Sequence, residues 1–474
     1  MENSETATTK KVTNLVVKLV PCLSIFLPFG AALFYVHLFG VNVFFADEWR
    51  FVLLMQKLDS DTLTIGDLFA HHYQHIYFFP WTVMLLLGTL TRYDTVPLMY
   101  LVQICFLVTS VVLFFAFKGD FKGDLKLPLP LSILLFAPIP FLVFSFRHFE
   151  NMLWGNQISF AFSQTFAVLA LYLNYVSQNK DFRKLFSVLS LFVLALVSAT
   201  VASFSAVQGL LVWPAGIFLI LIGPLGSLKG SVKNFLLGAW GLLGLGEWIF
   251  YFVEAVNFKD STSFLSYDLA HPAASLNYFL TLLGGSLFWQ DGLALGGGLL
   301  LVCLVVAALV LIFKNGRLKE NSFWVALLLF SLLSMMAITV GRSGLSEQLW
   351  VKAIQSRYAV FSILTVVSIY AVFVKLAWEI RSRVTIVFLV VLLGLVLPSI
   401  PTSYLLGLNR GEATKAYREE TQQIILNYKS QPDELPKLGV RPKDVKPYLP
   451  YLERHNYNVF AERDSIESGG ADEP

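Results

Sequence analysis

The sequence predicts an all-α polytopic membrane protein, and three observations support this fold class. First, 56% of the residues are hydrophobic, only 14% are charged and the mean hydropathy is +0.66, whereas about a quarter of a soluble protein is charged. Second, the apolar residues form long, nearly charge-free runs such as 292–313 and 322–340. A helix needs about 20 such residues to cross ~30 Å of hydrocarbon. Third, basic residues recur between the runs in an alternating pattern.

The apolar runs predict eleven spanning helices, near residues 14–38, 96–117, 128–146, 157–176, 185–201, 204–223, 234–253, 291–313, 322–340, 358–377 and 384–401. If the N-terminus is cytoplasmic, every inner loop holds two or three basic residues: Lys118, Lys122 and Lys126; Lys180, Arg183 and Lys184; Lys229 and Lys233; Lys314, Arg317 and Lys319; Lys375, Arg381 and Arg383. The turn near 201–203 has none. The positive-inside rule therefore predicts a cytoplasmic N-terminus and an extracytoplasmic C-terminus.

Two further apolar stretches, 76–90 and 276–289, are expected to lie in the outer interface. Crossing by either stretch would invert every later loop and destroy the alternation of basic residues. The chain is thus divided into a transmembrane domain, 1–401, whose first outer loop covers 39–95, and a small polar extracytoplasmic tail, 402–474. Within the tail, 412–426 has the pattern of an amphipathic helix.

Composition also excludes some functions. The net charge of +3 gives no bulk electrostatic basis for binding nucleic acid. All three cysteines lie within apolar runs, so neither a disulfide framework nor a metal cluster is expected. No cofactor is predicted.

An acidic pair, Asp47-Glu48, follows the first predicted span at the outer membrane surface. A carboxylate that is partly shielded from water has a raised pKa and can act as a general base. The alternative is that both carboxylates mark the end of a helix and stay solvated.

Three histidines, His71, His72 and His75, follow in the same outer loop. His71 and His75 are four residues apart and would share a face on a helix. They could form half of a metal site with Asp47 as third ligand, or contact a substrate phosphate. The alternative is that they are ordinary interfacial histidines.

Polar and aromatic residues cluster where the third predicted span ends on the outer side. They are Arg147, His148, Glu150, Trp154 and Gln157. Such a run can hold a sugar by hydrogen bonds and ring stacking, and Glu150 is a second outer carboxylate. The alternative is an interfacial turn anchored by a tryptophan.

Arg342, Arg357 and Tyr358 lie in or next to the late outer loop, 341–357. The positive-inside rule disfavours arginines on the outer side. Their presence there is explained if they bind a phosphate. The alternative is tolerance, because late loops feel the rule weakly.

The layout resembles the GT-C fold glycosyltransferases, membrane enzymes that use polyprenyl-phosphate sugars as donors. The matching elements are Asp47-Glu48, the helical pattern of 51–58, and 71–80 leading into 81–90. Glu150 stands where that family often has another acidic residue, and 341–344 with 356–358 resembles a late outer loop of uncharacterised bacterial members. The layout agrees over most of 14–400. The first loop is short for the family, and the WWD-type motif of oligosaccharyltransferases is absent.

The resemblance implies transfer of a sugar from a polyprenyl-phosphate donor in the outer leaflet of the lipid bilayer to a glycan, lipid or protein acceptor. Asp47 would deprotonate the acceptor hydroxyl, and Glu48 or Glu150 would position the acceptor or the base. The implied groups that stabilise the leaving phosphate are Arg342 or Arg357 and a histidine such as His75. No metal is required, and the expected location is the plasma or inner membrane of a cell.

A polytopic transporter or lipid flippase is the alternative function. Transporters place ionisable groups near the bilayer midplane and often show repeated halves. Glu247 lies inside a predicted span, but most charges crowd one face of the molecule and no repeat is visible. A third reading, an inactive scaffold, predicts no pocket joining Asp47, Glu150 and the late arginines.

Overall fold

The computed structural model describes residues 24–72, 74–121, 127–178, 185–223, 230–255, 261–345 and 352–462. The first outer loop contains η1 (Ala46–Arg50), α2 (Phe51–Asp59), α3 (Ile65–Leu68), β1 (His71–His72), β2 (His75–Ile76) and α4 (Phe78–Thr91). The bundle contains α5 (Val96–Asp120), α6 (Leu129–Phe136), α7 (Pro138–Val143), η3 (Phe146–His148), α8 (Phe149–Leu153), η4 (Gly155–Gln157), α9 (Ile158–Gln178), α10 (Leu185–Ser203), η6 (Val207–Leu211), α11 (Val212–Ile222), α12 (Gly230–Ala255), α13 (Ser261–Ala270), α14 (Pro272–Gly284), α15 (Asp291–Lys314), α16 (Ser322–Arg342), η7 (Ser343–Leu345), η8 (Ser356–Tyr358), α17 (Ala359–Ile380) and α18 (Arg383–Leu426).

Nine helices in the described part of the chain are long and apolar enough to cross a membrane. Two more of the predicted spans coincide with the shorter apolar helices Ser24–Phe39 and Val207–Ile222. The all-α polytopic class is therefore confirmed, while the count of eleven spans stays a prediction. Residues 14–23 lie outside the described part, as do Lys122, Lys126, Lys180, Arg183, Lys184 and Lys229.

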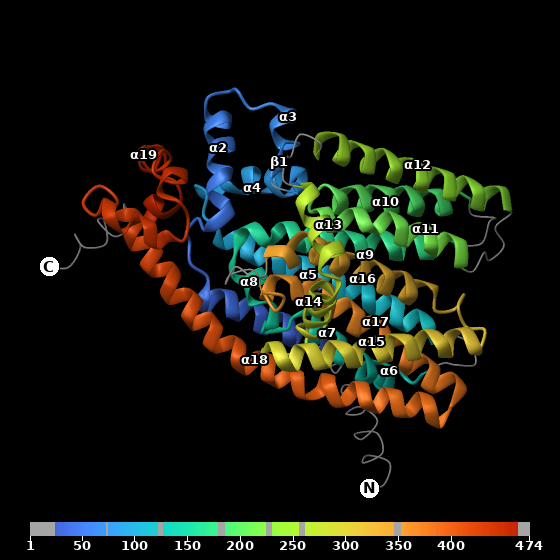
Figure 1. Cartoon of the computed structure of the whole chain (residues 1–474). Helices are drawn as coiled ribbons and strands as arrows, with labels where there is room; N and C mark the ends of the chain where they lie inside the picture. The colour runs from blue at the N-terminus through green and yellow to red at the C-terminus, as the bar shows by residue number, and fades with distance from the viewer. Residues whose placement is uncertain are drawn as a thin grey trace, which may run out of the picture.

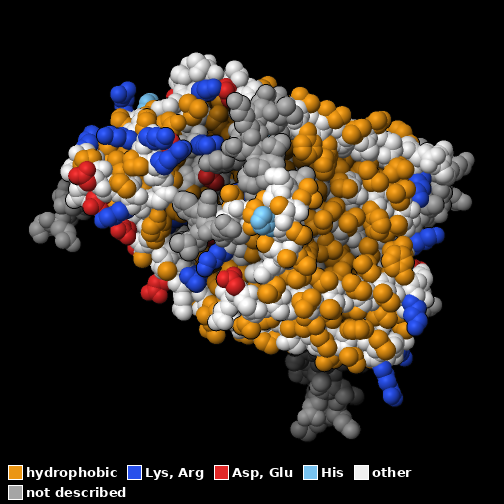
Figure 2. All heavy atoms as spheres, in the orientation of Figure 1, with side chains coloured by type: hydrophobic (Ala, Val, Ile, Leu, Met, Phe, Trp, Pro, Cys, Tyr) orange, Lys and Arg blue, Asp and Glu red, His pale blue; other side chains and the backbone are white. Residues whose placement is uncertain are grey.

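The bundle has a buried centre and an apolar outside. Every residue of α17 from Ala359 to Leu376 is buried. By contrast, the outer helices expose large apolar side chains, such as Phe186 at 86% on α10 and Leu242 at 72% on α12. Figure 2 shows these surfaces as a broad hydrophobic region between two ends that carry charged side chains. An exposed apolar surface of this kind is what a bilayer covers.

The two stretches expected in the interface form short helices. Helix α4 has 14 residues and α14 has 13, so at 1.5 Å per residue each is about 20 Å long and shorter than the hydrocarbon core. Their place in the outer interface stays a prediction.

Helix α18 is longer than predicted. It runs without interruption over 44 residues and contains Pro398 and Pro401, so it is roughly 66 Å long and extends well beyond one bilayer core. It joins the last predicted span to the predicted amphipathic helix 412–426. The expected domain boundary at 401 therefore falls inside one helix.

The tail after α18 folds back onto the first outer loop (Figure 1). It contains η9 (Pro432–Leu438), η10 (Pro442–Asp444), α19 (Leu449–Arg454) and η11 (Asn458–Glu462). Asn458 makes the connection, because its Nδ2 donates to Asn42 Oδ1 at 2.7 Å and to the Tyr93 carbonyl at 3.0 Å, and its Oδ1 accepts from the Phe44 N–H at 3.2 Å. The tail is thus docked through buried polar contacts.

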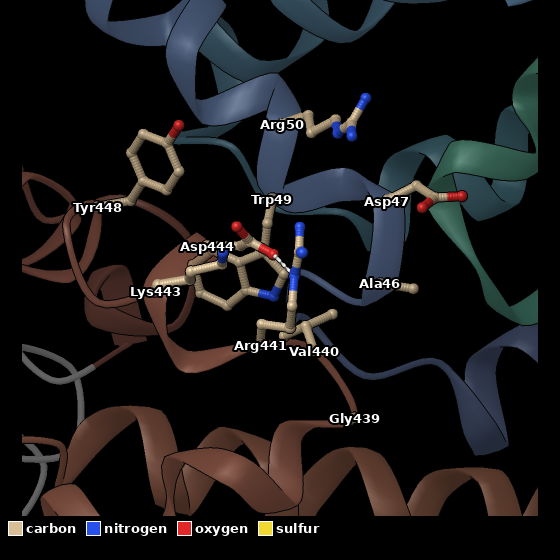
Figure 3. Close-up of a pocket in the computed structure, with 10 residues that line it drawn as sticks. All are labelled: Ala46, Asp47, Trp49, Arg50, Gly439, Val440, Arg441, Lys443, Asp444 and Tyr448. Carbon is tan, nitrogen blue, oxygen red and sulfur yellow. Dashed lines mark hydrogen bonds and ion pairs between the residues drawn. The ribbon is translucent and has the colours of Figure 1, made fainter. Parts of the chain in front are cut away.

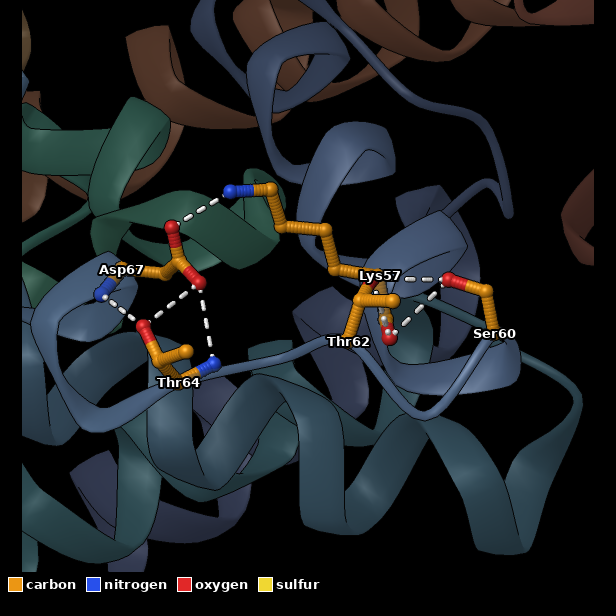
Figure 4. Close-up of polar contacts among 5 residues, drawn as sticks. All are labelled: Lys57, Ser60, Thr62, Thr64 and Asp67. Atoms are coloured by element: carbon orange, nitrogen blue, oxygen red, sulfur yellow. Dashed lines mark hydrogen bonds and ion pairs between the residues drawn. The ribbon is translucent and has the colours of Figure 1, made fainter.

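The loop between α2 and α3 is fixed by a local network (Figure 4). Lys57 Nζ lies 2.5 Å from Asp67 Oδ1, and Asp67 also closes a capping box with Thr64. The hydrogen bond from Lys57, followed by those from Thr64, lowers the pKa of Asp67 to about 2. This network holds the chain that leads into the histidine segment.

The histidine segment is a β-hairpin. β1 and β2 pair antiparallel with His72 opposite His75 and His71 opposite Ile76. The helical arrangement considered for His71 and His75 is therefore wrong, and these two side chains do not share a helix face. Directly opposite residues of an antiparallel pair lie on the same side of the ribbon, so His72 and His75 are the associated pair.

Candidate functional site

Some of the predicted site residues line three cavities at the predicted outer end of the bundle. The largest, called here the Asp47 cavity, has a volume of about 540 Å³. It is formed on one side by Ala46, Asp47, Trp49 and Arg50, and on the other by the tail residues Gly439, Val440, Arg441, Lys443, Asp444 and Tyr448 (Figure 3).

Asp47 is presented by a strained turn. Ala46, immediately before it, has φ of 48°, a left-handed conformation that costs about 1 kcal/mol or more for a residue other than glycine. The 3-10 helix η1 begins at this residue. Strain of this kind persists where the surrounding contacts fix it, and such positions concentrate at functional sites.

Glu48 does not line the Asp47 cavity, and its hydrogen bonds hold the turn in place. It is 1% exposed, and its carboxylate accepts hydrogen bonds from the Phe45 N–H at 2.8 Å and the Asn156 N–H at 2.9 Å. Burial raises the pKa of Glu48 to about 7, and the positive charge of Arg418 opposes this shift. Glu48 therefore acts as an anchor between the first loop and η4.

Arg418 reaches this anchor from α18. It is 5% exposed, and its guanidinium lies 3.9 Å from the centroid of the Phe45 ring, in cation–π contact. Gly155 provides the space for the Glu48 carboxylate, because an added Cβ would lie 3.1 Å from Glu48 Oε1. Sequence reasoning missed both Arg418 and the tail residues, since they are several hundred positions away from Asp47 in the chain.

The tail wall of the Asp47 cavity is polar. Arg441 pairs with Asp444 at 2.7 Å, and Lys443 and Tyr448 stand beside them (Figure 3). The local sequence signal was Gly439, whose φ of 70° turns the chain into this wall. Cations, a carboxylate and aromatic rings around one cavity are groups that can bind a polar ligand such as a carbohydrate.

Burial and neighbouring charges set the pKa values of the paired histidines, His72 and His75. Burial lowers the pKa of His72 to about 4, while the carboxylate of Asp47 raises it and Arg50 lowers it. His75 is 7% exposed, and burial followed by the charge of Arg342 holds its pKa well below the usual range. Both rings are therefore neutral at pH 7.

The tautomer of His75 is fixed by its neighbour. The Val207 N–H donates to His75 Nδ1 at 3.1 Å, so the proton of the neutral ring is on Nε2. The ring stacks on Tyr77, with centroids 5.2 Å apart. His75 can therefore offer one neutral N–H donor, and binding of a phosphate through a charged imidazolium is disfavoured.

A second, much smaller cavity of about 50 Å³ is lined by His75, Arg342 and Tyr358, among others. This volume suits one or two waters. Burial and the charge of Asp47 raise the pKa of the nearby Tyr77 hydroxyl, while the charge of Arg342 lowers it.

Glu150 and Arg357 form a clamp between α8 and η8. Their closest atoms, Arg357 Nη1 and Glu150 Oε1, are 3.2 Å apart. Glu150 Oε2 also accepts from Ser356 Oγ at 2.7 Å and from the Arg357 N–H at 3.0 Å. Both carboxylate oxygens of Glu150 are therefore engaged in holding η8. Arg357 interacts electrostatically with Asp47 as well.

A third cavity, called here the Arg147 cavity, has a volume of about 230 Å³. Its lining residues are Arg147, Phe149, Glu150, Trp289, Lys352, Ile354, Gln355, Ser356 and Arg410. Arg147 is 2% exposed and donates to the carbonyls of Phe288 at 3.0 Å and Ile354 at 2.6 Å. The predicted residues thus meet at one end of the bundle without sharing a single cavity.

Several predicted residues line none of these three cavities. His71 is half-buried and lies edge-on to Tyr251 with ring centroids 6.0 Å apart. His148 is fully buried and bonded through Nε2 to the Val143 carbonyl at 2.8 Å. Trp154 packs edge-on against Phe45 at 5.3 Å, and Gln157 is 4% exposed. Glu247, the residue considered for transport, accepts a 2.8 Å hydrogen bond from Trp213 Nε1 and lines none of these three cavities either.

One observation bears on a possible metal ligand. Among the described residues, no group of three or more His, Cys, Asp or Glu is arranged to hold a metal ion. The hairpin therefore does not assemble the metal site considered for His71, His75 and Asp47.

Comparison with known proteins gives little further guidance. No family model matches the chain, and no solved structure matches it. A curated protein of Archaeoglobus fulgidus, described as uncharacterized, is 26% identical over 224 residues, which cover 44% of this chain and 56% of the relative. The chain thus spans just over half the length of that relative.

Proposed function

We propose that the protein is a membrane glycosyltransferase that moves a sugar from a polyprenyl-phosphate donor to an acceptor hydroxyl on the outer face. The observation that supports this most is the presentation of Asp47 by a strained turn into a polar cavity of about 540 Å³. The charge of Asp47 acts on the neutral His72 and on Arg357. This combination provides a base, a polar binding cavity and a cation together.

In the proposed reaction, a carboxylate oxygen of Asp47 accepts the proton of the acceptor hydroxyl. The hydroxyl oxygen forms a bond to the anomeric carbon of the donor, and the bond from that carbon to the phosphate oxygen breaks. The polyprenyl phosphate leaves with the electron pair. Arg357 and Arg342 stabilise the charge that builds on the phosphate, and His75 Nε2–H adds a neutral donor.

The other predicted catalytic residues act indirectly in this mechanism. Glu48 fixes the turn that carries Asp47, and Glu150 holds Arg357 through the clamp. Both are positioning residues. Removing either side chain should therefore disturb the placement of Asp47 or Arg357 more than the proton transfer itself.

Release of free polyprenyl phosphate from labelled polyprenyl-phosphate sugars tests the proposal. Membranes that contain the full-length protein are compared with membranes from an empty-vector strain, with a panel of donor sugars and candidate acceptors. Release of one particular sugar above the vector background is the expected result. If the folded protein releases no polyprenyl phosphate from any donor of the panel in the presence of acceptors, the transferase proposal fails and a transporter or scaffold is favoured instead.

A further inference from the structure

We propose that the Arg147 cavity binds the phosphate of an anionic membrane lipid. This inference does not depend on the proposed transferase reaction. It rests on the charge of the cavity walls, on an available guanidinium nitrogen, and on the apolar helices that lead up to the cavity.

The cavity has an excess of positive charge. Arg147, Lys352 and Arg410 line it together with one carboxylate, Glu150. Glu150 is already neutralised by Arg357 at 3.2 Å. Lys352 and Arg410 are exposed, and within the described ranges neither makes an ion pair. Three cations around about 230 Å³ favour an anionic group with several acceptor oxygens.

Arg147 is a prearranged ligand for such a group. Its Nε and Nη2 donate to the carbonyls of Phe288 and Ile354, at 3.0 Å and 2.6 Å. The guanidinium is also 4.9 Å from the centroid of the Trp289 ring. These contacts fix the side chain while Nη1 has no hydrogen-bond partner among the described residues. A fixed guanidinium with a donor to spare binds an oxyanion with little loss of entropy.

The position of the cavity identifies the ligand as a lipid. Its lining includes Trp289, just before α15, and Arg410 of α18, and both helices are long and apolar enough to cross a membrane. Close to Arg410 on α18, Leu405 and Leu408 are 66% and 42% exposed, and at the start of α15 Leu293 is 57% exposed. Trp289 lies two residues before the start of α15, as expected of a residue at headgroup level. A phosphate in the cavity would therefore have its hydrocarbon chains along apolar helix surfaces.

Native mass spectrometry of the delipidated, full-length protein in mild detergent tests this site. Phosphatidylglycerol, phosphatidylcholine and inorganic phosphate are added separately, and the apparent dissociation constants are compared. The test variant is the double substitution Lys352→Gln with Arg410→Gln. The matched control is Lys415→Gln with Lys446→Gln, which removes the same charge outside the cavity.

We expect the wild type and the control to retain phosphatidylglycerol in preference to phosphatidylcholine. Each cation near a lipid headgroup contributes roughly 5-fold, so the test variant should lose about 25-fold in affinity for phosphatidylglycerol. Equal affinity of the test variant and the control would overturn the site. Full displacement of the lipid by millimolar inorganic phosphate would overturn its assignment to a lipid.

Discussion

Replacement of Glu48 by glutamine should remove a pH dependence of stability that this buried carboxylate creates. Glu48 is 1% exposed, and burial raises its pKa from 4.5 to about 7. An acid whose pKa is raised by folding binds more protons in the folded state between these two values. The folded state is therefore progressively destabilised as the pH rises from 4.5 through 7.

The magnitude follows from the shift. At 1.36 kcal/mol per unit, a change from 4.5 to about 7 corresponds to about 3 kcal/mol once the pH is above both values. Glutamine stays neutral, keeps one carbonyl oxygen to accept from the Phe45 or Asn156 N–H, and leaves the other N–H unpaired at a cost of about 1–3 kcal/mol. That cost is the same at all pH values, so the pH-dependent part can be separated from it.

Thermal unfolding of the purified protein in detergent measures the effect. At each pH, the unfolding midpoint temperature of the wild type is subtracted from that of Glu48→Gln. This difference should be roughly 3–6 °C more positive at pH 8 than at pH 5. Glu412→Gln, which changes an exposed carboxylate, is the control and should follow the wild type at both pH values. A Glu48→Gln difference that does not change with pH would refute the argument that burial sets the ionisation of Glu48.

Two further substitutions test the contacts that hold the site. Gly155→Ala would put a Cβ 3.1 Å from Glu48 Oε1, and it should cost about 1–3 kcal/mol of stability. Gly241→Ala, where nothing lies within 4 Å, should be neutral or slightly stabilising in the same unfolding assay. Asn458→Ala should leave several buried partners unpaired and release the tail, which limited proteolysis after α18 would detect. Equal protease resistance of Asn458→Ala and the exposed control Asn427→Ala would count against docking by Asn458.

The transmembrane helices were predictable because their signal is local. About 20 consecutive apolar residues and the charges at their ends are written in the chain itself, and each predicted span coincides with an apolar helix of the described part. The helix that contains the last predicted span, 384–401, continues to Leu426. A membrane helix tolerates proline when its neighbours satisfy the freed backbone groups, and α18 continues through Pro398 and Pro401.

The site was only partly predictable because its contacts are long-range. Asp47, Glu150 and Arg357 stood out as unusual charges at the ends of spans, but their partners could not be inferred from spacing. Arg418 reaches Glu48 from α18, and Asn458 binds Asn42 across 416 positions. Likewise, the spacing of the histidines is compatible with a helix or a hairpin, and pairing with β2 decided between them.

The central claim is that Asp47 is the base of a transfer reaction, and the most direct measurement compares two aspartates of the same cavity. Polyprenyl phosphate release is followed with the donor sugar that the wild type accepts, for Asp47→Asn and Asp444→Asn. Asp444 lines the cavity but is paired with Arg441 at 2.7 Å. Loss of roughly 10²–10⁴ in rate by Asp47→Asn, with Asp444→Asn within a few-fold of the wild type, is the predicted result. Wild-type turnover by Asp47→Asn would contradict the account.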